Sequence, residues 1–400
     1  MENILLIDCN NFFASCEELF NPSLKGKAIC VLSNNDGCIV ARSNAAKNLG
    51  VPMGMPYFMA KKKFKNVIYL SGNLKKYSEI SKRIMKKLYD FTPSVEQYSI
   101  DEAFLDIKGC LNCHKKTPLE LAVQIRKEIK EEIGIDVSIG VSKTKTLSKI
   151  ASEIAKSQIR KNLQTETLGV YEISKNNLDK ILENTPIQEV WGIGSNLHKF
   201  FRKHNIINAK MFVKLDDSFI QRNLGKKGLE LKMELIGIKA YPVIDYYVAP
   251  KSISRSSSFK EFTTDKAYII NELNGHLHRV CIKLRNHNLR AGVLSVMLRT
   301  KDFRVDSEKF VFDTPKDSEF ELYETMHRLF NFLYKKGVIY RSSGVTVSKL
   351  TDKEDIQLIL FESDADKKKK KLSNAWDKIE QKFGYGAISV GIKKKNKEEK

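Results

Sequence analysis

The chain has 400 residues, of which 42% are hydrophobic and 29% are charged, and its formal net charge is +21. This length accommodates several domains with separate cores, and the positive excess indicates a polyanionic partner, most simply nucleic acid. No apolar run approaches the ~20 residues that cross a bilayer, and the N-terminus reads as a strand followed by an acid rather than as a signal peptide. The seven cysteines, an odd number scattered through apolar segments, suit a reducing cytoplasm.

The first predicted strand covers residues 4–7 and ends at Asp8. Its continuous apolar run is typical of a strand buried on both faces. Asn10 or Asn11 then offers a helix N-cap, and apolar residues recur at helical spacing from Phe12 onward. An acid at the end of a buried strand suits a catalytic ligand, but it suits a solvated or capping Asp equally well.

Residues 26–73 are rich in small and polar side chains and predict a hairpin, with strands at 29–32 and 38–41 around an Asn-Asp-Gly turn. A helix to Leu49 follows and is stopped by Gly50. Arg42 and Lys47 are candidates for contact with a phosphate-bearing ligand, although a solvated charged face explains either residue.

A basic amphipathic helix is predicted over 74–92, and the stretch from Tyr98 to Asp106 then embeds the adjacent acids Asp101 and Glu102 in strand-forming residues. Neighbouring side chains of a strand point to opposite faces, so the two acids share a site only where a turn interrupts the strand. We therefore predict a hairpin that bends near residues 100–102. The alternative is one strand with the two acids on separate surfaces.

A helix at 119–133, a strand at 137–141 and a helix at 148–156 complete this region, so the order of elements predicts an α+β sandwich with helices on one face. Asp8 and the acidic hairpin, placed in one sheet, make a candidate divalent-metal site. Oxygen ligands without nearby His or Cys favour Mg²⁺ or Mn²⁺ over zinc. Lys156 has two interpretations. It binds a polyphosphate at this site, or it lies at the C-terminal end of its helix and complements the helix dipole.

Residues 110–114 spell Cys-Leu-Asn-Cys-His, which matches the haem-attachment pattern and half of a zinc site. Covalent haem attachment requires export, for which the sequence gives no sign. We expect a loop with incidental thiols.

From about residue 167 the predicted elements become short helices. Residues 187–194, followed by further apolar residues at helical spacing, have the outline of a helix-hairpin-helix. In such a motif Gly192 and Gly194 let backbone N–H groups approach a DNA phosphate regardless of sequence, and Lys199 follows nearby. Residues 241–251, with two prolines and few helix formers, read as an interdomain linker.

Residues 252–350 predict a separate small α/β unit with strands at 253–259, 292–299, 309–313 and 344–349 and helices through residue 284 and at 320–334. Basic residues available there for backbone phosphates are Arg255, Lys283, Arg285, Arg290, Arg299, Lys301, Arg304 and Arg341. The tail contains an apolar run at 357–361, five lysines at 367–371, a short helix at 372–383 and a basic end that we expect to be disordered.

With these residues the chain resembles the Y-family DNA polymerases, and among them the UmuC-like branch, the catalytic subunit of DNA polymerase V. The motifs of the resemblance are Asp8 with residues 11–17, residues 33–44, Ser99-Ile100-Asp101-Glu102-Ala103, and residues 139–142 with Lys149 and Lys156. The resemblance implies an α+β multidomain, right-hand polymerase. Its parts are a ferredoxin-like palm (1–12 and 74–165), small fingers (13–73), a helical thumb with the helix-hairpin-helix (166–240), the linker (241–251), an α/β little finger (252–352) and a tail (353–400).

The resemblance also implies low-fidelity, template-directed translesion synthesis of an SOS type by a nucleoid-associated enzyme that uses primer–template DNA and dNTPs. Asp8, Asp101 and Glu102, helped by the carbonyl of Cys9, would hold two Mg²⁺ ions, with Mn²⁺ as a substitute. Phe12 and Phe13 would contact the nucleotide, and Phe13 would be the steric gate against ribonucleotides. The alternative, a core aromatic, applies better to Phe12 than to Phe13. Arg42, Lys47 and Lys156 would bind the triphosphate, and Asn44 stands where the wider family often has Tyr.

The tail residues Gln357, Leu358, Leu360 and Phe361 resemble the peptide that docks into the bacterial sliding clamp. The UmuC-like branch further implies a UmuD-like accessory subunit and a recombinase filament as partners. Two alternatives remain at this point: a palm-type nucleotidyl cyclase with the same two-metal logic, and a catalytically silent DNA-bound protein that recruits the clamp.

Overall fold

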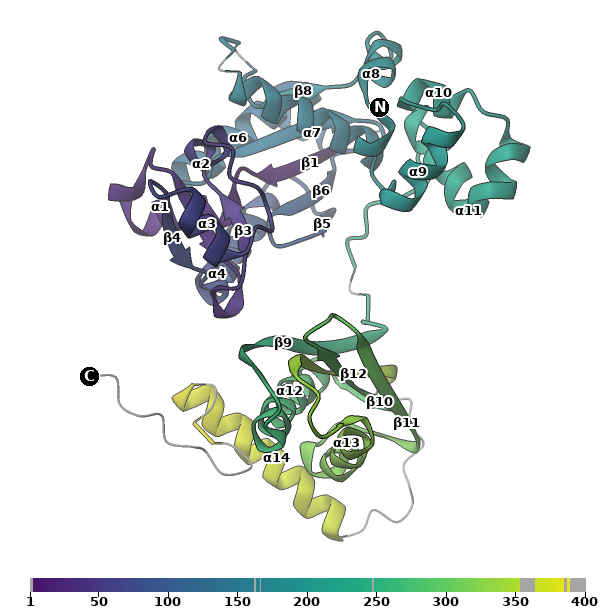
Figure 1. Ribbon diagram of the computed structural model, residues 1–400. Coiled ribbons are helices and arrows are strands. Elements are labelled where there is room, and N and C mark those ends of the chain that lie inside the picture. Colours follow the sequence, from purple (N-terminus) through teal and green to yellow (C-terminus); the bar gives the residue numbers. More distant parts are fainter. Residues whose placement is uncertain are drawn as a thin grey trace. The chain divides into compact units, whose positions relative to one another are not determined.

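The computed structural model describes residues 3–161, 163–165, 167–246, 248–352, 364–384 and 387–388. The chain forms two compact units, Met1–Tyr247 and Val248–Lys400. The first unit contains a five-stranded and a three-stranded sheet followed by a helical region, and the second contains a four-stranded sheet with helices (Figure 1).

The five-stranded sheet has the strand order β5-β6-β1-β7-β8. β1 lies at its centre and pairs antiparallel with β6 and β7, while β8 runs parallel to β7. The strands are β1 (Ile4–Cys9), β5 (Val95–Gln97), β6 (Glu102–Asp106), β7 (Val137–Ser142) and β8 (Val170–Glu172). All of β1 is buried, which confirms the prediction from its apolar run.

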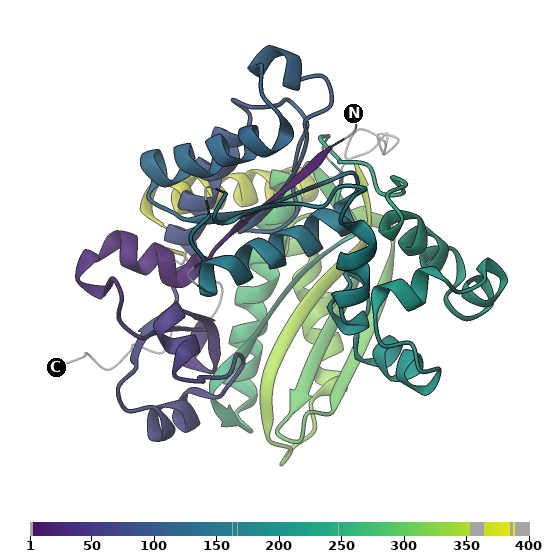
Figure 2. The same ribbon diagram turned by 90° about the horizontal axis from the view of Figure 1, so that it is seen from above.

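Helices cover both faces of this sheet, so the prediction of helices on one face only was wrong. The helices of this part are α1 (Phe12–Phe20), α4 (Leu74–Leu88), α5 (Leu111–His114), α6 (Pro118–Ile133) and α7 (Lys145–Arg160). Leu5 and Ile7 share one core with buried residues of α1, α4 and α6, whereas α7 packs on the opposite face (Figure 2).

Gly140 of β7 explains how α7 reaches that face. A Cβ atom at this position would lie 2.0 Å from the backbone oxygen of Ser148 and 2.4 Å from the backbone nitrogen of Ser152, both in α7. Only glycine permits so close a contact between helix and strand. Ser148 Oγ also donates a hydrogen bond of 2.8 Å to the carbonyl oxygen of Ile4, which fixes α7 against β1.

The three-stranded sheet has the order β3-β2-β4 and contains the predicted hairpin. Its elements are β2 (Ile29–Leu32), β3 (Ile39–Arg42), β4 (Ile68–Ser71), α2 (Asn44–Asn48), α3 (Tyr57–Lys63) and the short 3₁₀ turns at Pro22–Leu24 and Asn34–Asp36. The predicted change of region at residue 13 falls inside α1, whose buried Phe12 and Cys16 belong to the core of the five-stranded sheet.

The helical region consists of α8 (Leu178–Asn184), a 3₁₀ turn (Ile187–Glu189), α9 (Ser195–Lys203), α10 (Ala209–Val213) and α11 (Asp217–Leu235). Its core includes Leu147 and Ile150 of α7, so this region is built directly onto that helix. The segment that follows, predicted as a linker, begins as an ordered attachment to the five-stranded sheet. Val243 packs on Leu6 and Phe104, and the amide of Ile244 donates to Glu96 Oε2 at 2.6 Å.

The second unit has the strand order β11-β10-β12-β9, with every neighbouring pair antiparallel. Its elements are β9 (Ser252–Thr263), α12 (Lys266–Asn286), β10 (Leu289–Thr300), β11 (Val305–Lys316), α13 (Glu319–Leu333), β12 (Tyr340–Asp352) and α14 (Asp364–Phe383). Each predicted element of 252–350 is present. α14 is longer than the predicted helix at 372–383, because the lysine run 367–371 is part of it. The predicted clamp peptide 357–361 and basic end lie outside the described residues.

Candidate active site

Strand pairing brings Asp8 and Glu102 together. The two residues are direct partners in the antiparallel ladder of β1 and β6, as are Leu6 and Phe104. Directly opposed residues of such a ladder point to the same face of the sheet. Leu6 alternates with Leu5 and Ile7, which face the core with α6, so Asp8 and Glu102 lie on the face covered by α7.

The third acid, Asp101, lies in the turn between β5 and β6, which confirms the predicted hairpin. Ser99 organises this turn, because its hydroxyl accepts from the amide of Glu102 at 3.0 Å and bonds Asp101 Oδ1. The carbonyl oxygen of Asp101 accepts from the amide of Cys9 at 2.9 Å. The turn is therefore attached to the end of β1, beside Asp8.

Lysines of α7 hold two of these acids. Lys156 Nζ lies 2.6 Å from Asp8 Oδ2, and Lys149 Nζ lies 2.8 Å from Glu102 Oε1. The seven-residue spacing of the two lysines places both on one face of the helix. Lys156 also pairs with Glu153 at 2.7 Å. Because α7 continues to Arg160, Lys156 does not lie at the end of its helix, so the C-terminal reading of this lysine was wrong.

The electrostatic environment of Asp8 favours a bound cation. Burial raises the pKa of Asp8 to about 7; Lys156 opposes this rise, whereas the nearby Glu102 and Asp101 carboxylates add to it. Asp8 is only 7% exposed. A buried carboxylate beside two others is stabilised by positive charge, which the lysine ammonium groups supply here.

The three acids line one cleft of about 920 Å³. Within the described residues, no group of three or more His, Cys, Asp or Glu side chains is gathered as a ready metal site. The acids are instead turned toward Lys156, Lys149 and Ser99. Their carboxylate oxygens are the donors that hard divalent cations prefer, so the residues fit such an ion once it takes the place of the ammonium groups.

Basic residues line the same cleft. Lys47 Nζ donates to Asn11 Oδ1, and Asn11 Nδ2 donates to Asn44 Oδ1 at 2.9 Å. Burial lowers the pKa of Lys47, as do the nearby charges of Arg160, Arg42 and Lys156. Five basic residues line this cavity, namely Lys27, Arg42, Lys47, Lys156 and Arg160. This arrangement is suited to a polyanionic ligand such as a triphosphate.

Two of these details differ from the sequence predictions. Asn11 occupies the N-cap position of α1, but its side chain makes no capping bond and contacts Asn44 and Lys47 instead. Arg160 was not singled out from the sequence, although its four-residue spacing from Lys156 on α7 was the signal that places it on the same helix face.

Phe12 and Phe13 have different surroundings. Phe12 is buried in the core of the five-stranded sheet, as the core reading of this residue predicted. Phe13 is half-buried, lines the cleft and stacks on Tyr77 with ring centroids 4.7 Å apart. The hydroxyl of Tyr77 donates to Glu17 Oε1, so the ring beneath Phe13 is itself held in place.

The predicted helix-hairpin-helix lies between α8 and α9. Gly192 has a φ of 90°, a conformation that glycine adopts without strain, and Gly194 is the N-cap of α9. A Cβ atom on either glycine would meet nothing within 4 Å, so both lie at an open surface. Lys199 is exposed one turn into α9.

In the second unit, strand register separates the two arginines predicted to bind DNA. Arg255 is opposite Val345, which belongs to the core beneath the helices. Arg299 is opposite Ser342, on the other face of the sheet. Serines and threonines of the same open face are Ser252, Ser254, Ser256, Ser258, Ser295, Ser342, Thr346 and Ser348. Arg285 contacts no open face, because it is ion-paired with Glu319 and Asp377.

The Cys110–His114 stretch forms a short helix without metal-site geometry. Cys110 Sγ bonds Thr92 Oγ1 at 3.6 Å, and His114 Nε2 bonds the carbonyl oxygen of Phe91 at 3.0 Å. The reading as a segment with incidental thiols agrees with these contacts. None of the helices in the described part of the chain is long and apolar enough to cross a membrane.

Two family models match the chain. The impB/mucB/samB family matches residues 7–153, and the C-terminal domain of the same family matches residues 250–360. Protein UmuC of Salmonella typhimurium is 31% identical over 96% of this chain and 92% of its own length. The chain belongs to the impB/mucB/samB family. DNA polymerase IV of Bacillus velezensis is 28% identical over 99% of this chain and 94% of its own length.

Solved structures agree with this assignment. A Y-family DNA polymerase chimera, Dbh-Dpo4(243-245)-Dbh, matches 88% of this chain and 99% of its own, with a TM-score of 0.72 and 26% identity. DinB from Sulfolobus solfataricus matches 86% of this chain and 98% of its own, with a TM-score of 0.55 and 25% identity. The chain is thus an α+β multidomain, Y-family DNA polymerase of the UmuC type, and it performs translesion synthesis.

The family assignment also gives the reaction and the substrates. It is a DNA-directed DNA polymerase that binds primer–template DNA and dNTPs, and the comparisons favour neither a nucleotidyl cyclase nor a silent accessory protein. Because Y-family polymerases are metal-dependent nucleotidyltransferases, a divalent cation belongs to its reaction.

Proposed function

We propose that nucleotide transfer takes place in the cleft lined by Asp8, Asp101 and Glu102. The observation that supports this placement is the pairing of Asp8 with Glu102 on adjacent strands, facing the lysines of α7 in a cleft that basic residues also line. The cleft thus contains both acids that can hold cations and basic residues that can hold phosphates.

The three carboxylates, together with the carbonyl of Cys9, would hold two Mg²⁺ ions, which Mn²⁺ can replace. When bound, such ions lower the pKa of the primer 3′-hydroxyl and neutralise charge on the leaving pyrophosphate. Lys156 and Lys149 must release Asp8 and Glu102 for this purpose. Lys156 then remains within the cleft as a ligand for the triphosphate.

The incoming dNTP would place its triphosphate against Lys156, Lys47 and Arg42, and Arg160 is a further basic residue of the same cleft. Asn44 lines the cleft and contacts Asn11, so its contribution would be to fix Lys47 through Asn11. Phe13 would lie beneath the deoxyribose as the steric gate, supported by the ring of Tyr77. Phe12 belongs to the core beside Phe13 and also lines the cleft.

The palm then corresponds to the five-stranded sheet and the fingers to the three-stranded sheet. The thumb corresponds to α8–α11, and the little finger to the four-stranded sheet. Backbone amides at Gly192 and Gly194, with Lys199, would hold a DNA phosphate. The open face of the little-finger sheet, with Arg299 and its row of hydroxyl groups, suits a DNA backbone better than the helix-covered face on which Arg255 lies.

The remaining partners stay predictions. Gln357, Leu358, Leu360 and Phe361 would bind the sliding clamp, and a UmuD-like subunit and a recombinase filament would activate the enzyme in an SOS-type response at the nucleoid. Replacing these four residues by Ala should abolish clamp-stimulated extension and leave clamp-free extension unchanged. The matched control replaces Lys353 and Glu354, which precede the peptide.

The direct test is extension of a primed template by the full chain with Mg²⁺ and dNTPs, on undamaged and abasic templates. We expect extension on both, with the clamp and accessory proteins added if the chain alone is inactive. Glu102→Ala should abolish extension and retain DNA binding, whereas Glu131→Ala, an exposed acid of α6, should change neither. Wild-type extension by Glu102→Ala would refute the site.

A further inference from the structure

Lys149, to which the proposed mechanism gives no role after it leaves Glu102, lies in a cage of aromatic rings. Its Nζ atom is 2.8 Å from Glu102 Oε1 and 4.6 Å from the centroid of the Tyr98 ring. The rings of Trp191 and Phe104 lie 5.7 and 5.8 Å from the same nitrogen. Aromatic faces attract a cation electrostatically. Lys149 therefore has two kinds of partner, a carboxylate and a set of rings.

Trp191 joins this cage from the thumb. Its indole Nε1 donates a hydrogen bond of 3.1 Å to the hydroxyl oxygen of Tyr98, and the two rings are perpendicular with centroids 5.7 Å apart. Tyr98 belongs to the catalytic hairpin, three residues before Asp101. On its other side Trp191 meets the ring of Tyr241, also edge to face, at 5.7 Å.

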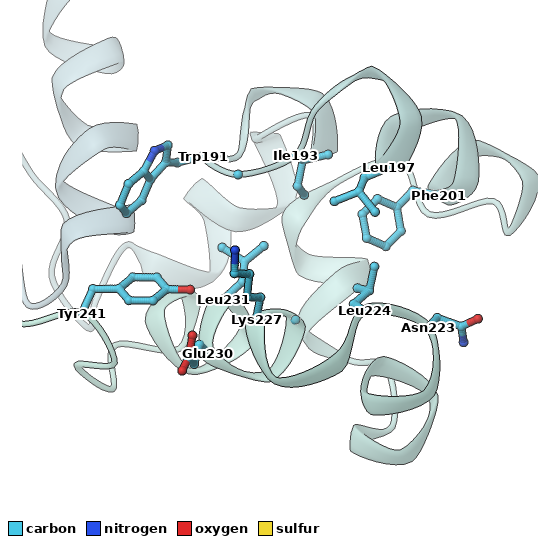
Figure 3. Close-up of a pocket in the computed structure, with 12 residues that line it drawn as sticks. Trp191, Ile193, Leu197, Phe201, Asn223, Leu224, Lys227, Glu230, Leu231 and Tyr241 are labelled. Atoms are coloured by element: carbon cyan, nitrogen blue, oxygen red, sulfur yellow. The ribbon is translucent and has the colours of Figure 1, made fainter. Parts of the chain in front are cut away.

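The Trp191 ring is not part of the thumb core. That core includes the neighbouring Val190 and Ile193 but omits Trp191. Figure 3 shows Trp191 and Tyr241 at one end of a cavity of about 540 Å³, with Leu197 and Phe201 at the other end. The ring partners of Trp191 are thus the palm residues Tyr98 and Phe104 together with Tyr241, rather than side chains of its own core.

The backbone of Trp191 continues directly into the open glycine turn. Gly192 follows it in the chain, and neither Gly192 nor Gly194 has a neighbour within 4 Å of its Cβ position. One residue therefore connects the turn proposed to hold a DNA phosphate with the ring cage around Lys149.

We propose that Trp191 is a positioning residue that links the Gly192–Gly194 turn to the catalytic Glu102 through Tyr98 and Lys149. When a divalent cation takes Glu102, the ring cage keeps the ammonium group of Lys149 in place, so the lysine does not compete for the carboxylate. Trp191 completes that cage only while the glycine turn is correctly seated. The inference rests on the proposed function, because it presumes Glu102 as a cation ligand and the turn as a DNA contact.

The kinetic test compares Trp191→Ala with Phe200→Ala, another half-buried thumb aromatic, whose ring contacts lie within the thumb. In single-turnover extension, Trp191→Ala should lower the rate at saturating DNA about tenfold and raise the Mg²⁺ concentration needed for half-maximal rate, with the DNA dissociation constant changed less than about twofold. Phe200→Ala should affect DNA binding or stability and leave the saturated rate unchanged.

A double-mutant cycle tests the route. Trp191→Phe removes the donor of the hydrogen bond and Tyr98→Phe removes its acceptor, while both keep a ring. If Trp191 acts through Tyr98, each variant should lower the saturated rate about threefold, and the double variant should be no slower than either one. Multiplicative effects would show that the two residues act separately and would overturn the proposed route.

A spectroscopic measurement tests the link without turnover. The chain has two tryptophans, so Trp376→Phe leaves Trp191 as the only indole. With primer–template DNA ending in a dideoxynucleotide, Mg²⁺ should change the emission of Trp191, and this change should be absent when Glu102→Ala is added. Trp191 emission that does not change when Mg²⁺ is added would overturn the inference.

The proposed site and the role of Trp191 can be refuted separately. Wild-type extension by Glu102→Ala would refute the proposed site itself. An inactive Glu102→Ala combined with a Trp191→Ala variant of normal rate and normal Mg²⁺ dependence would refute only the role of Trp191.

Discussion

Both units of the polymerase bury clusters of charged side chains, but one cluster lines a cleft and the other is closed. The side chains of Glu102, which lines the cleft, and of its partner Lys149 are 19% and 17% exposed. In the second unit, Arg285 and Glu319 are 9% and 5% exposed. The ion pairs themselves are similar in length, so the difference lies in what can reach them. The open pairs can exchange partners, whereas the closed pairs can only hold the fold.

The closed cluster attaches α14 to α12 and α13. Arg285 of α12 binds Glu319 of α13 at 2.9 Å and Asp377 of α14 at 2.6 Å. His278 bonds Glu319 through Nδ1 at 2.7 Å and Glu380 through Nε2 at 2.9 Å. A carboxylate at each nitrogen favours an N–H on that nitrogen, so the two carboxylates together favour the protonated imidazole. The ring of Trp376 stacks on it at 4.4 Å.

The largest effect is expected from Asp8→Asn in the open cluster. The substitution should lower extension by about 10³-fold or more, the effect typical of losing a charge-stabilising group in phosphoryl transfer. It should not lower the melting temperature, because Asp8 is crowded by two other acids and Lys156 keeps Glu153 as a partner. Extension assays and thermal melts of the same preparation check both statements. A strongly destabilised but active variant would contradict the assignment of the open cluster to activity and of the closed cluster to stability.

The opposite result is expected from Arg285→Ala in the closed cluster. Removing one partner of a buried ion pair leaves carboxylates without compensation, which costs about 3–5 kcal/mol of unfolding free energy. Urea unfolding followed by the fluorescence of Trp376, in a Trp191→Phe background, reports on α14 directly. The matched control is Arg304→Ala, whose pair with Asp306 is solvent-exposed and should be worth less than about 1 kcal/mol. Equal losses for the two variants would contradict the closed network.

These two clusters also mark what the sequence could and could not predict. The apolar run of β1 and the acids of the hairpin were recognisable because periodicity and residue type are local signals. The partners of those acids were not recognisable from the sequence. Lys149 pairs with Glu102 because Gly140 lets α7 pack close to the sheet, and this contact is not a local signal. The role of Arg285 was misjudged because Glu319 and Asp377 lie 34 and 92 residues away in the chain.

The same limit applies to the little finger. Each of its four strands was predicted, although each is longer than the prediction. The faces of Arg255 and Arg299 were not predicted, because they depend on register, which pairs each strand with residues far along the chain. A sequence pattern predicts that a strand exists, but it does not predict which residue of the neighbouring strand lies opposite each of its residues.

The two units also differ in the exposure of an aromatic ring at each charged cluster. Trp376 is buried against His278, whereas Phe13 stacks on Tyr77 with part of its surface facing the cleft. Phe13→Ala should raise ribonucleotide incorporation relative to deoxyribonucleotide incorporation by about tenfold or more, since only shape excludes the extra hydroxyl. Competition between rNTP and dNTP in extension measures this ratio. Phe12→Leu, a change in the core behind it, should leave the ratio unaltered.

The smallest effect is the pH dependence of α14 docking. Burial disfavours the charged His278 ring, but its hydrogen bonds to Glu319 and Glu380 outweigh burial and raise the pKa of His278 above its usual value. Arg285 on α12 and Asp377 on α14 are the other charged groups of this cluster. Because the pKa of His278 is higher in the folded protein, its contribution to stability is complete below the ordinary His pKa of about 6.5 and is lost as the pH rises through the raised value.

The neutral ring keeps one N–H donor and loses the other, so the loss should be that of one charge-assisted hydrogen bond, about 1.5–3 kcal/mol. Arg285 still holds α14 at that pH, which makes the effect smaller than that of Arg285→Ala. Urea unfolding at a series of pH values from 6 upward, followed by Trp376 fluorescence, measures it. His278→Gln should remove this pH dependence while other titrating groups remain, and an unchanged profile in that variant would place the origin elsewhere. Since no residue of the cleft takes part, extension at low urea should not follow the same profile.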